Sequence, residues 1–166
     1  GFTLIELMVV VVIIGILAAV AVPKLFGMIA KSKASEIGPA AGEYVKLQNA
    51  FVAEKGDSIG NWFKIGYNGP GNWVSGSEAS TMSNAAGASS KSTNFTYVDG
   101  IAGVIVIQSI TGWSATNNAK LNDCDQGKTW SMALASSGAS AGEVNYTPTQ
   151  TDPACSVLTP NFGAIK

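Results

Sequence analysis

One apolar run at the N-terminus constrains this chain more than any other feature. Residues 2–23 (FTLIELMVVVVIIGILAAVAVP) contain a single charged residue, whereas the other 20 charges lie between Lys24 and Lys166. A helix of this length is about 33 Å long and can cross a hydrocarbon core about 30 Å thick. The rest of the chain has too few large apolar side chains to enclose a helix that is apolar on every face. The run also exceeds the roughly 7 to 15 apolar residues of a secretory signal peptide and lacks a clear cleavage pattern of small residues. We therefore expect a retained membrane span.

The composition narrows the possible function classes. The chain has 10 lysines, no arginine and no histidine, and its formal net charge is −1. Because phosphates are neutralised by an excess of positive charge, no nucleic acid is expected as a primary ligand. Without histidine the chain lacks the commonest general base near neutral pH and the commonest zinc ligand. We expect neither enzyme activity nor a cofactor.

The charged residue inside the apolar run is Glu6, which lies between Ile5 and Leu7. A charge at the centre of a bilayer costs about 2.5 to 3.5 kcal/mol on insertion scales, and such groups usually have a partner. Two explanations are open. The carboxyl group reaches the headgroups or is protonated, or it pairs with a terminal amine of a neighbouring chain. The second explanation would favour association of chains within the lipid.

The segment GFTLIELMVVVVIIGILAAVAVPKL resembles the class III signal and N-terminal helix of the type IV pilin superfamily. The resemblance is specific because it combines G-F-T-L-I-E with a charge-free run that ends in proline. It implies that a prepilin peptidase cuts between Gly1 and Phe2 and that the new amine of Phe2 is methylated. It also implies that Glu6 recruits the next subunit by pairing with its neighbour's amine. We expect Gly1 to be absent from the mature chain.

Gly15 and Pro23 interrupt the apolar helix. Proline removes one backbone hydrogen bond and clashes with the carbonyl of Ala19, and glycine costs about 1 kcal/mol relative to alanine. The helix should therefore weaken between these two positions. In filaments of the family this segment is often extended, so the resemblance implies local melting of the helix. The alternative is an ordinary kink at Pro23, with Gly15 allowing close helix packing.

After residues 1–23, apolar residues at steps of three and four predict that an amphipathic helix continues over 24–56 and buries one face in a globular domain. The expected buried face consists of Phe26, Ile29, Ala30, Ile37, Ala40, Ala41, Tyr44, Leu47, Phe51 and Val52. Gly38 and Pro39 imply a second bend, and Gly56 is predicted to end the helix. Residues 57–94 are rich in Gly, Ser, Asn and Ala and are predicted to form a loop held by four aromatic residues. These are Trp62, Phe63, Tyr67 and Trp73.

The remaining residues, 95–166, are predicted to supply a sheet and a C-terminal region. Candidate strands are 94–98, 103–110, 129–134 and 143–147, and the segment GVIVIQSI at 103–110 is the strongest because it is largely β-branched. An antiparallel sheet of about four strands on the second half of the helix gives an α+β architecture. This is the fold that the resemblance implies.

Cys124 and Cys155 are the two cysteines of the chain. An exported protein meets an oxidising compartment, so we expect them to form a disulfide. This arrangement resembles the disulfide-bounded C-terminal region of many type IV pilins. A redox pair is the alternative, but the spacing lacks the C-x-x-C pattern.

A weak metal signal lies beside the first cysteine. Asn122, Asp123 and Asp125 cluster oxygen ligands, and major pseudopilins of type II secretion as a group bind calcium in a C-terminal loop. Three ligands do not make a site. We therefore interpret these residues as turn formers and expect no metal.

These features predict a structural subunit, most simply the major pilin of a type IV pilus that supports adhesion, twitching motility or DNA uptake. The alternatives are a major pseudopilin of a type II secretion system and a minor or competence pilin. The subunit would wait in the inner membrane with its globular domain in the periplasm, then join an extracellular homopolymer. By resemblance, its partners would be the prepilin peptidase, an assembly ATPase and a membrane platform protein.

Overall fold

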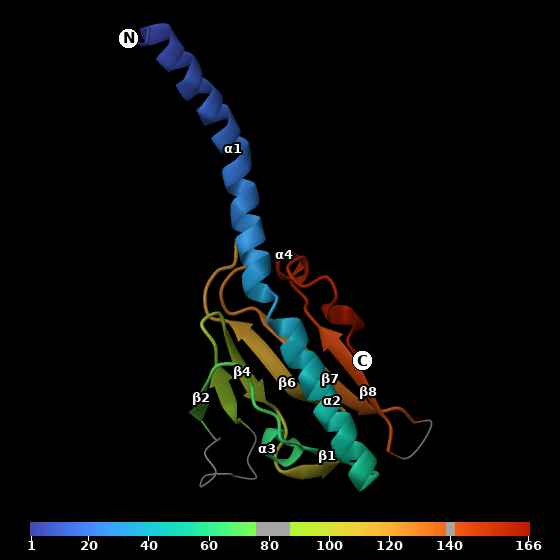
Figure 1. The fold of residues 1–166 in the computed structure, drawn as a ribbon. Coiled ribbons are helices and arrows are strands. Elements are labelled where there is room, and N and C mark those ends of the chain that lie inside the picture. The colour runs from blue at the N-terminus through green and yellow to red at the C-terminus, as the bar shows by residue number, and fades with distance from the viewer. Residues whose placement is uncertain (76–86, 139–141) are drawn as a thin grey trace.

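The structure, a computed structural model, describes residues 1–75, 87–138 and 142–166. Two helices in line, α1 (Leu4–Ala34) and α2 (Ile37–Lys55), form a long rod. The lower part of this rod lies against a sheet, and most of α1 projects beyond the globular domain (Figure 1). The molecule is therefore an elongated stalk attached to a compact head.

Local chemistry explains where the two helices begin and end. Thr3 caps α1, because its side chain accepts a hydrogen bond from the Glu6 amide and its own amide donates to the Glu6 carboxylate. The rod breaks at Ser35 and Glu36, close to the second bend predicted at Gly38 and Pro39. Gly56 ends α2 with a φ of 86°, a conformation that favours glycine.

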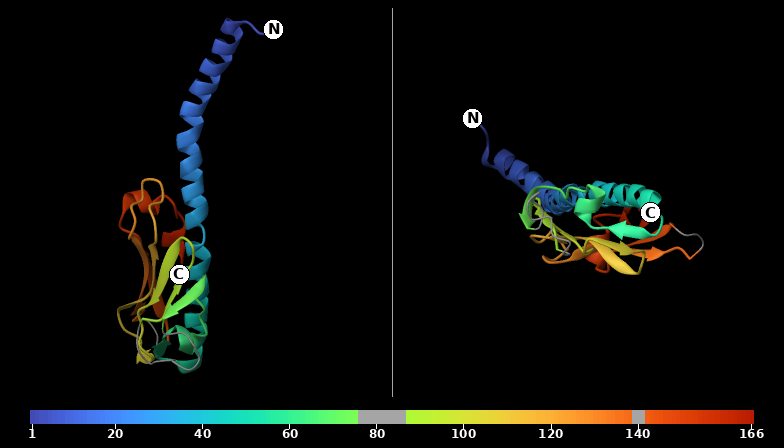
Figure 2. Two further views of the ribbon diagram at one scale, coloured as in Figure 1. Left: turned by 90° about the vertical axis from the view of Figure 1, so that its left-hand side faces the viewer. Right: turned by 90° about the horizontal axis from the view of Figure 1, so that it is seen from below.

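The main sheet is antiparallel and, within the described residues, has six strands in the order β2-β3-β4-β6-β7-β8. Their bounds are Asn72–Ser75, Ser89–Lys91, Phe95–Asp99, Ile110–Asn117, Thr129–Ser136 and Val144–Thr149. A second pair, β1 (Ser58–Gly60) with β5 (Val104–Val106), lies near the end of α2. Figure 2 shows the helical rod covering one face of the main sheet. The architecture is thus the predicted α+β fold.

The strand count is larger than the four predicted, and the strongest predicted strand is divided. Residues 103–110 contain all of β5 and only the first residue of β6, with bends at Ile107 and Ser109. β-branched composition favours extended backbone but does not show where an extended segment turns. The rest of β6, TGWSATN, has Trp113 as its one large apolar residue and contains Gly112, so it gave no strand signal.

The core lies between α2 and the sheet. Its largest side chains with under 2% exposure include Trp62, Trp113, Trp130, Tyr44, Tyr67, Tyr97 and Phe95. Gly112 is required on β6 because a Cβ atom there would collide with the Tyr44 hydroxyl. Gln48, fully buried on α2, donates to the Gly60 carbonyl and accepts from the Gly60 amide, joining the helix to β1. The helix is therefore both stalk and core element.

The region predicted as a loop, residues 57–94, contains β1, the short helix α3 (Trp62–Ile65), β2 and β3, while residues 76–86 lie outside the described chain. Two of its four aromatic residues, Trp62 and Tyr67, are buried. The other two, Phe63 and Trp73, are 45% and 40% exposed. The first pair therefore anchors the segment in the core, and Trp73 packs against the Trp62 ring at its edge.

After β8 the chain crosses back towards the stalk through α4 (Pro153–Ser156) and ends after a 3-10 turn, η1 (Phe162–Ala164). This C-terminal segment lies beside the junction of α1 and α2 (Figure 1). Leu158 and Phe162 are buried in the core, so the segment is fixed to the head.

Candidate functional site

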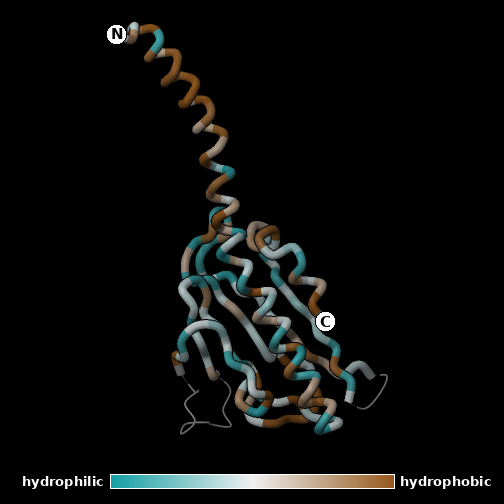
Figure 3. Tube along the Cα trace, viewed as in Figure 1, coloured by the Kyte–Doolittle hydropathy of each residue, from teal (hydrophilic) through white to brown (hydrophobic). Residues whose placement is uncertain are grey.

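The projecting part of α1 is an uncovered apolar surface. Every residue from Gly1 to Phe26 is exposed, and the apolar side chains are between 46% and 95% exposed. In Figure 3 most of the projecting stalk is brown, with a teal band near its tip and another above the head. By length and composition this helix could cross a membrane. So much exposed apolar surface on a helix marks a place where lipid or protein must cover it.

The predicted buried face of the helix needs one correction here. Phe26 and Ile29 were expected to pack in the globular domain, but they are 58% and 42% exposed. The first buried residue of the rod is Ala30. The apolar periodicity extends from the head into the projecting part of α1. The sequence alone therefore could not show at which residue burial begins.

At the N-terminal tip, the Glu6 carboxylate is engaged within its own chain. One of its oxygens accepts hydrogen bonds from the Thr3 amide and the Thr3 hydroxyl, each at 2.7 Å. A carboxylate at a helix N-terminus is favoured by the helix dipole. An incoming amine from a second chain would therefore meet an already oriented carboxylate, and the role of Glu6 in assembly stays a prediction.

Gly1 and Phe2 precede the helix, and the Phe2 side chain is 95% exposed. Both residues lie in non-helical backbone, in which a peptide bond can be reached by a protease. The predicted cleavage and methylation at this position remain predictions.

Gly15 and Pro23 lie within α1, which is continuous through both residues in the isolated chain. A Cβ atom at Gly15 would meet nothing within 4 Å, so this side of the helix is open to a neighbour. The melting that the resemblance implies concerns the assembled filament, and it stays a prediction.

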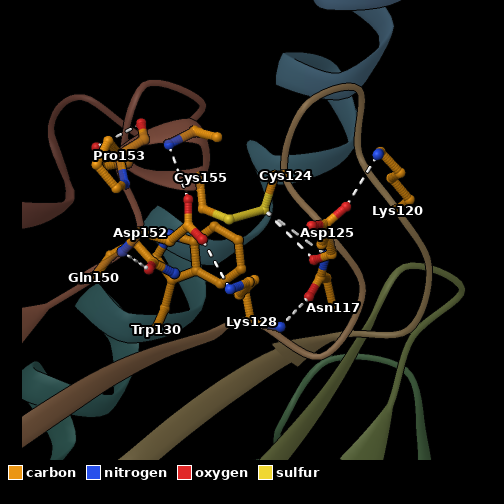
Figure 4. Close-up of a disulfide and its surroundings, with 12 residues drawn as sticks. Asn117, Lys120, Cys124, Asp125, Lys128, Trp130, Gln150, Asp152, Pro153 and Cys155 are labelled. Atoms are coloured by element: carbon orange, nitrogen blue, oxygen red, sulfur yellow. Dashed lines mark hydrogen bonds and ion pairs between the residues drawn. A yellow bond between two sulfur atoms is a disulfide. The ribbon is translucent and has the colours of Figure 1, made fainter.

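The predicted disulfide between Cys124 and Cys155 is confirmed. It joins the loop after β6 to α4, and two ion pairs flank it (Figure 4). Lys128 Nζ lies 2.9 Å from Asp152, and Lys120 Nζ lies 2.9 Å from Asp125. The Lys128 ammonium holds the pKa of Asp152 below its usual range.

Beneath the disulfide, the Trp130 indole donates to the Thr159 hydroxyl at 2.8 Å. The disulfide and the Lys128–Asp152 ion pair connect the C-terminal segment to the loop after β6, and the Trp130 hydrogen bond connects it to β7. The head therefore has a rigid rim at the end where the stalk leaves it.

The weak calcium candidates make polar contacts within their own loop. Asp125 pairs with Lys120, whereas the Asn122 amide donates to Asp123 in an exposed turn where Asn122 has a φ of 55°. In the described ranges of the chain, no three acidic, histidine or cysteine side chains form a group that could hold a metal ion. The arrangement is that of a polar turn.

Two acidic residues that the sequence analysis did not single out make structural connections. Glu36, at the break of the rod, accepts hydrogen bonds from the Tyr97 hydroxyl at 2.6 Å and from the Ser92 hydroxyl. Asp99, at the end of β4, is 1% exposed and accepts from the amides of Trp62 and Ile101. Burial raises the pKa of Asp99 to about 6. The hydrogen-bond partners of Glu36 and the Trp62 partner of Asp99 are distant in the sequence, and Ile101 lies in a loop. Residue spacing therefore gave no signal for either acid.

Comparisons with known proteins agree with this geometry. Residues 1–22 match the family model described as the prokaryotic N-terminal methylation motif. The type IV major pilin protein PilA of Myxococcus xanthus is 51% identical over 55 residues, which cover 33% of this chain and 25% of that protein. The type IV major fimbrial protein FimA of Dichelobacter nodosus is 41% identical over 83 residues, covering 48% of this chain and 52% of FimA. The fimbrial protein EcpC of Eikenella corrodens is 46% identical over 56 residues, covering 34% of this chain and 37% of EcpC.

The matched segments thus span between about a quarter and a half of these relatives' own length. The family-model match over residues 1–22 lies in the stalk, where the uncovered apolar surface lies.

Proposed function

We propose that this chain, a member of the type IV pilin superfamily by its N-terminal motif and its fold, is the structural subunit of a type IV pilus filament. The observation that carries the proposal is the bare apolar stalk, with no residue before Ala30 buried in the single chain. A bilayer covers such a helix in the unassembled subunit, and the stalks of other copies cover it in a polymer. The names of the similar fimbrial and pilin proteins support the same function.

The mechanism is polymerisation without bond-making chemistry by this chain. The subunit resides in the inner membrane through residues 2–23, with its head in the periplasm, and assembly moves the stalk from lipid into a bundle of like stalks. Apolar surface stays covered throughout, so the transfer carries no large hydrophobic penalty. The finished polymer is an extracellular filament.

In this mechanism an ion pair between neighbouring subunits sets their axial register. Cleavage after Gly1 frees the amine of Phe2, and the Glu6 carboxylate of an adjacent subunit binds it. An ion pair in a medium of low dielectric is strong, and an unpaired carboxylate there is costly. The prepilin peptidase, the assembly ATPase and the platform protein are partners of this proposal.

The test is to shear filaments from cells at native expression and to measure the intact mass of their main polypeptide. We expect long filaments composed mainly of this chain, beginning at methylated Phe2 and containing the Cys124–Cys155 bond. If the chain stays with the membranes and its deletion blocks protein secretion, the pilus function is wrong and the pseudopilin function replaces it. A mature N-terminus at Gly1 would contradict the pairing of Phe2 with Glu6.

A further inference from the structure

A groove of about 430 Å3 runs along the junction of α1 and α2. One wall comes from the rod and the other from the C-terminal segment beyond α4. Among the described residues that line it, Lys31 at the rim is the one with a charged side chain. The lining residues that carry the argument are Lys31, Ala34, Gly38, Leu158, Phe162 and Ile165.

The base of the groove is apolar and close to the helix backbone. Ala34, Leu158 and Phe162 are 0%, 8% and 4% exposed, so they form a packed floor, while Ile165 is half-buried on the outer wall. A Cβ atom at Gly38 would meet nothing within 4 Å. Small residues of this kind let another helix approach closely.

The groove is continuous with the bare stalk. Lys31 and Ala34 belong to α1, whose apolar side chains are exposed up to Ile29. The C-terminal segment lies next to the rod where the stalk enters the head (Figure 1). An apolar partner that covers the side of the lower stalk carrying Lys31 and Ala34 therefore reaches the mouth of the groove.

We propose that this groove binds the apolar part of α1 from a second copy of the chain, so that the C-terminal segment of each subunit contacts its neighbour's stalk. The inference rests on the proposed function and adds a contact between head and stalk to the packing of stalk on stalk. A helix with its side chains is about 10 to 12 Å wide, so it lies across the groove and inserts the side chains of one ridge.

Three features select a second copy as the occupant. Residues 7–23 of the stalk carry no charge, which matches a groove whose floor is apolar and whose charge is at the rim. The stalk is itself unburied and needs apolar cover. Finally, the groove and the stalk are different surfaces of one molecule. Such a heterologous contact does not close on itself in a pair, and it generates an open helical array when the rotation between successive copies does not close a ring.

A photo-crosslinking experiment tests the contact directly. Benzoylphenylalanine is placed at Asn161, which is exposed, lines the groove and caps η1 without a side-chain hydrogen bond. The matched control position is Val157, which is 60% exposed on the same segment but does not line the groove. Sheared filaments are irradiated, and the crosslinked peptides are identified by mass spectrometry.

We expect Asn161 to crosslink to residues 2–23 of another copy and Val157 not to do so. Crosslinks from Asn161 only to head peptides or to lipid, or none at all in filaments that have assembled, would overturn this inference and leave the proposed function intact. If the wild-type chain forms no filaments, the proposed function and the inference fail together.

Two substitutions test the effect of the contact on assembly. Ile165→Glu introduces a carboxylate at the wall, and because an unpaired buried charge is strongly unfavourable, we expect the filament yield to fall about tenfold or more. Val157→Glu adds the same charge outside the groove and should leave the yield within about twofold, since an exposed charge is well solvated. Ser35→Trp fills the groove from the rod without adding charge and should reduce the yield in the same direction.

Thermal unfolding of the unassembled subunits shows whether each variant folds. Reduced yield from a Ser35→Trp subunit with the wild-type unfolding midpoint supports the groove contact. Equal yields from all three variants would refute it.

Discussion

Asp99 is a buried carboxylate in the middle of the head, where it orders the backbone by accepting the amides of Trp62 and Ile101. The Tyr44 hydroxyl of α2 interacts electrostatically with the Asp99 carboxylate. Burial raises the pKa of Asp99 from 3.8 to about 6, and its two backbone hydrogen bonds offset part of that effect. The side chain therefore joins α3 to β4 at an electrostatic cost near neutral pH.

This cost predicts a pH dependence of stability. Because the folded pKa of Asp99 is raised, its contribution is fully present below pH 3.8 and is lost as the pH rises through about 6. Relative to Asp99→Asn, which does not titrate, the wild-type chain should lose up to about 3 kcal/mol of unfolding free energy between pH 4 and 7. Urea unfolding of both proteins in detergent at several pH values measures the difference. A difference that does not vary with pH contradicts the assignment.

Glu6 gives a prediction on assembly at the same scale. Glu6→Gln keeps a side chain that can cap the Thr3 amide but removes the charge, so the subunit should insert normally while filament yield falls about tenfold or more. Thr3→Val is the matched control because it removes the side-chain cap and retains the carboxylate. Filament yield and membrane content are read by immunoblot. Normal filaments from Glu6→Gln would show that the charge is dispensable.

Single residues were predictable from the sequence when their chemistry conflicted with their surroundings. Glu6 in an apolar run and a lone pair of cysteines are conspicuous, and the disulfide was confirmed. Glu36 and Asp99 are ordinary acids in polar sequence, and their partners Tyr97 and Trp62 lie 61 and 37 residues away. Burial and pairing at such separations come from the tertiary fold.

At the scale of elements, α1 is a continuous helix in the isolated chain in spite of Pro23. A proline inside a helix costs about 3 kcal/mol relative to alanine, so this stretch is the weakest part of the stalk. If residues 15–23 melt on assembly, Pro23→Ala should keep them helical and slow their amide hydrogen exchange in filaments. Ala18→Ser, a mild change in the same stretch, is the control. Equal protection in the wild type and in Pro23→Ala would exclude melting.

The disulfide connects two elements that the sequence separates by 31 positions. Replacing both cysteines with serine should reduce the free energy of unfolding by about 3 to 4 kcal/mol, since the bond closes a long loop in the unfolded chain. The ion pair of Lys128 and Asp152 is exposed, and Lys128→Gln should cost far less. Urea unfolding compares the two variants. Equal losses would mean that the covalent bond contributes little.

Elements were predictable where one periodicity extends over many residues. The rod spans 52 residues from Leu4 to Lys55 and was apparent from its apolar pattern. β6 was missed because its polar residues face one side of a sheet whose other side is covered by α2. Gly112, which reads as a strand breaker, is there to admit Tyr44. Strand signals of this kind depend on the neighbouring element rather than on local propensity.

At the scale of the whole molecule, the head does not need the stalk for its core. The first residue of the hydrophobic core is Ala30. The disulfide and all the core tryptophans therefore belong to the part of the chain from residue 30 onward. A chain that begins at Lys24 should therefore stay monomeric in water and unfold at the same temperature as the full chain in detergent. Size exclusion and circular dichroism measure both. Aggregation or a midpoint lowered by more than about 5 °C, roughly 1 kcal/mol, would show that the stalk stabilises the head.

The hydrogen bonds of Glu36 have a mechanical consequence for a filament under tension. A force applied along the stalk arrives at the break between α1 and α2, where the backbone is not held by a continuous helix. There the Glu36 carboxylate accepts hydrogen bonds from the Tyr97 hydroxyl of β4 and from the Ser92 hydroxyl of the preceding turn. Part of the force is thus transmitted to β4, an inner strand of the six-stranded sheet, before it reaches α2. The load on the head therefore acts near the centre of the sheet rather than at an edge strand.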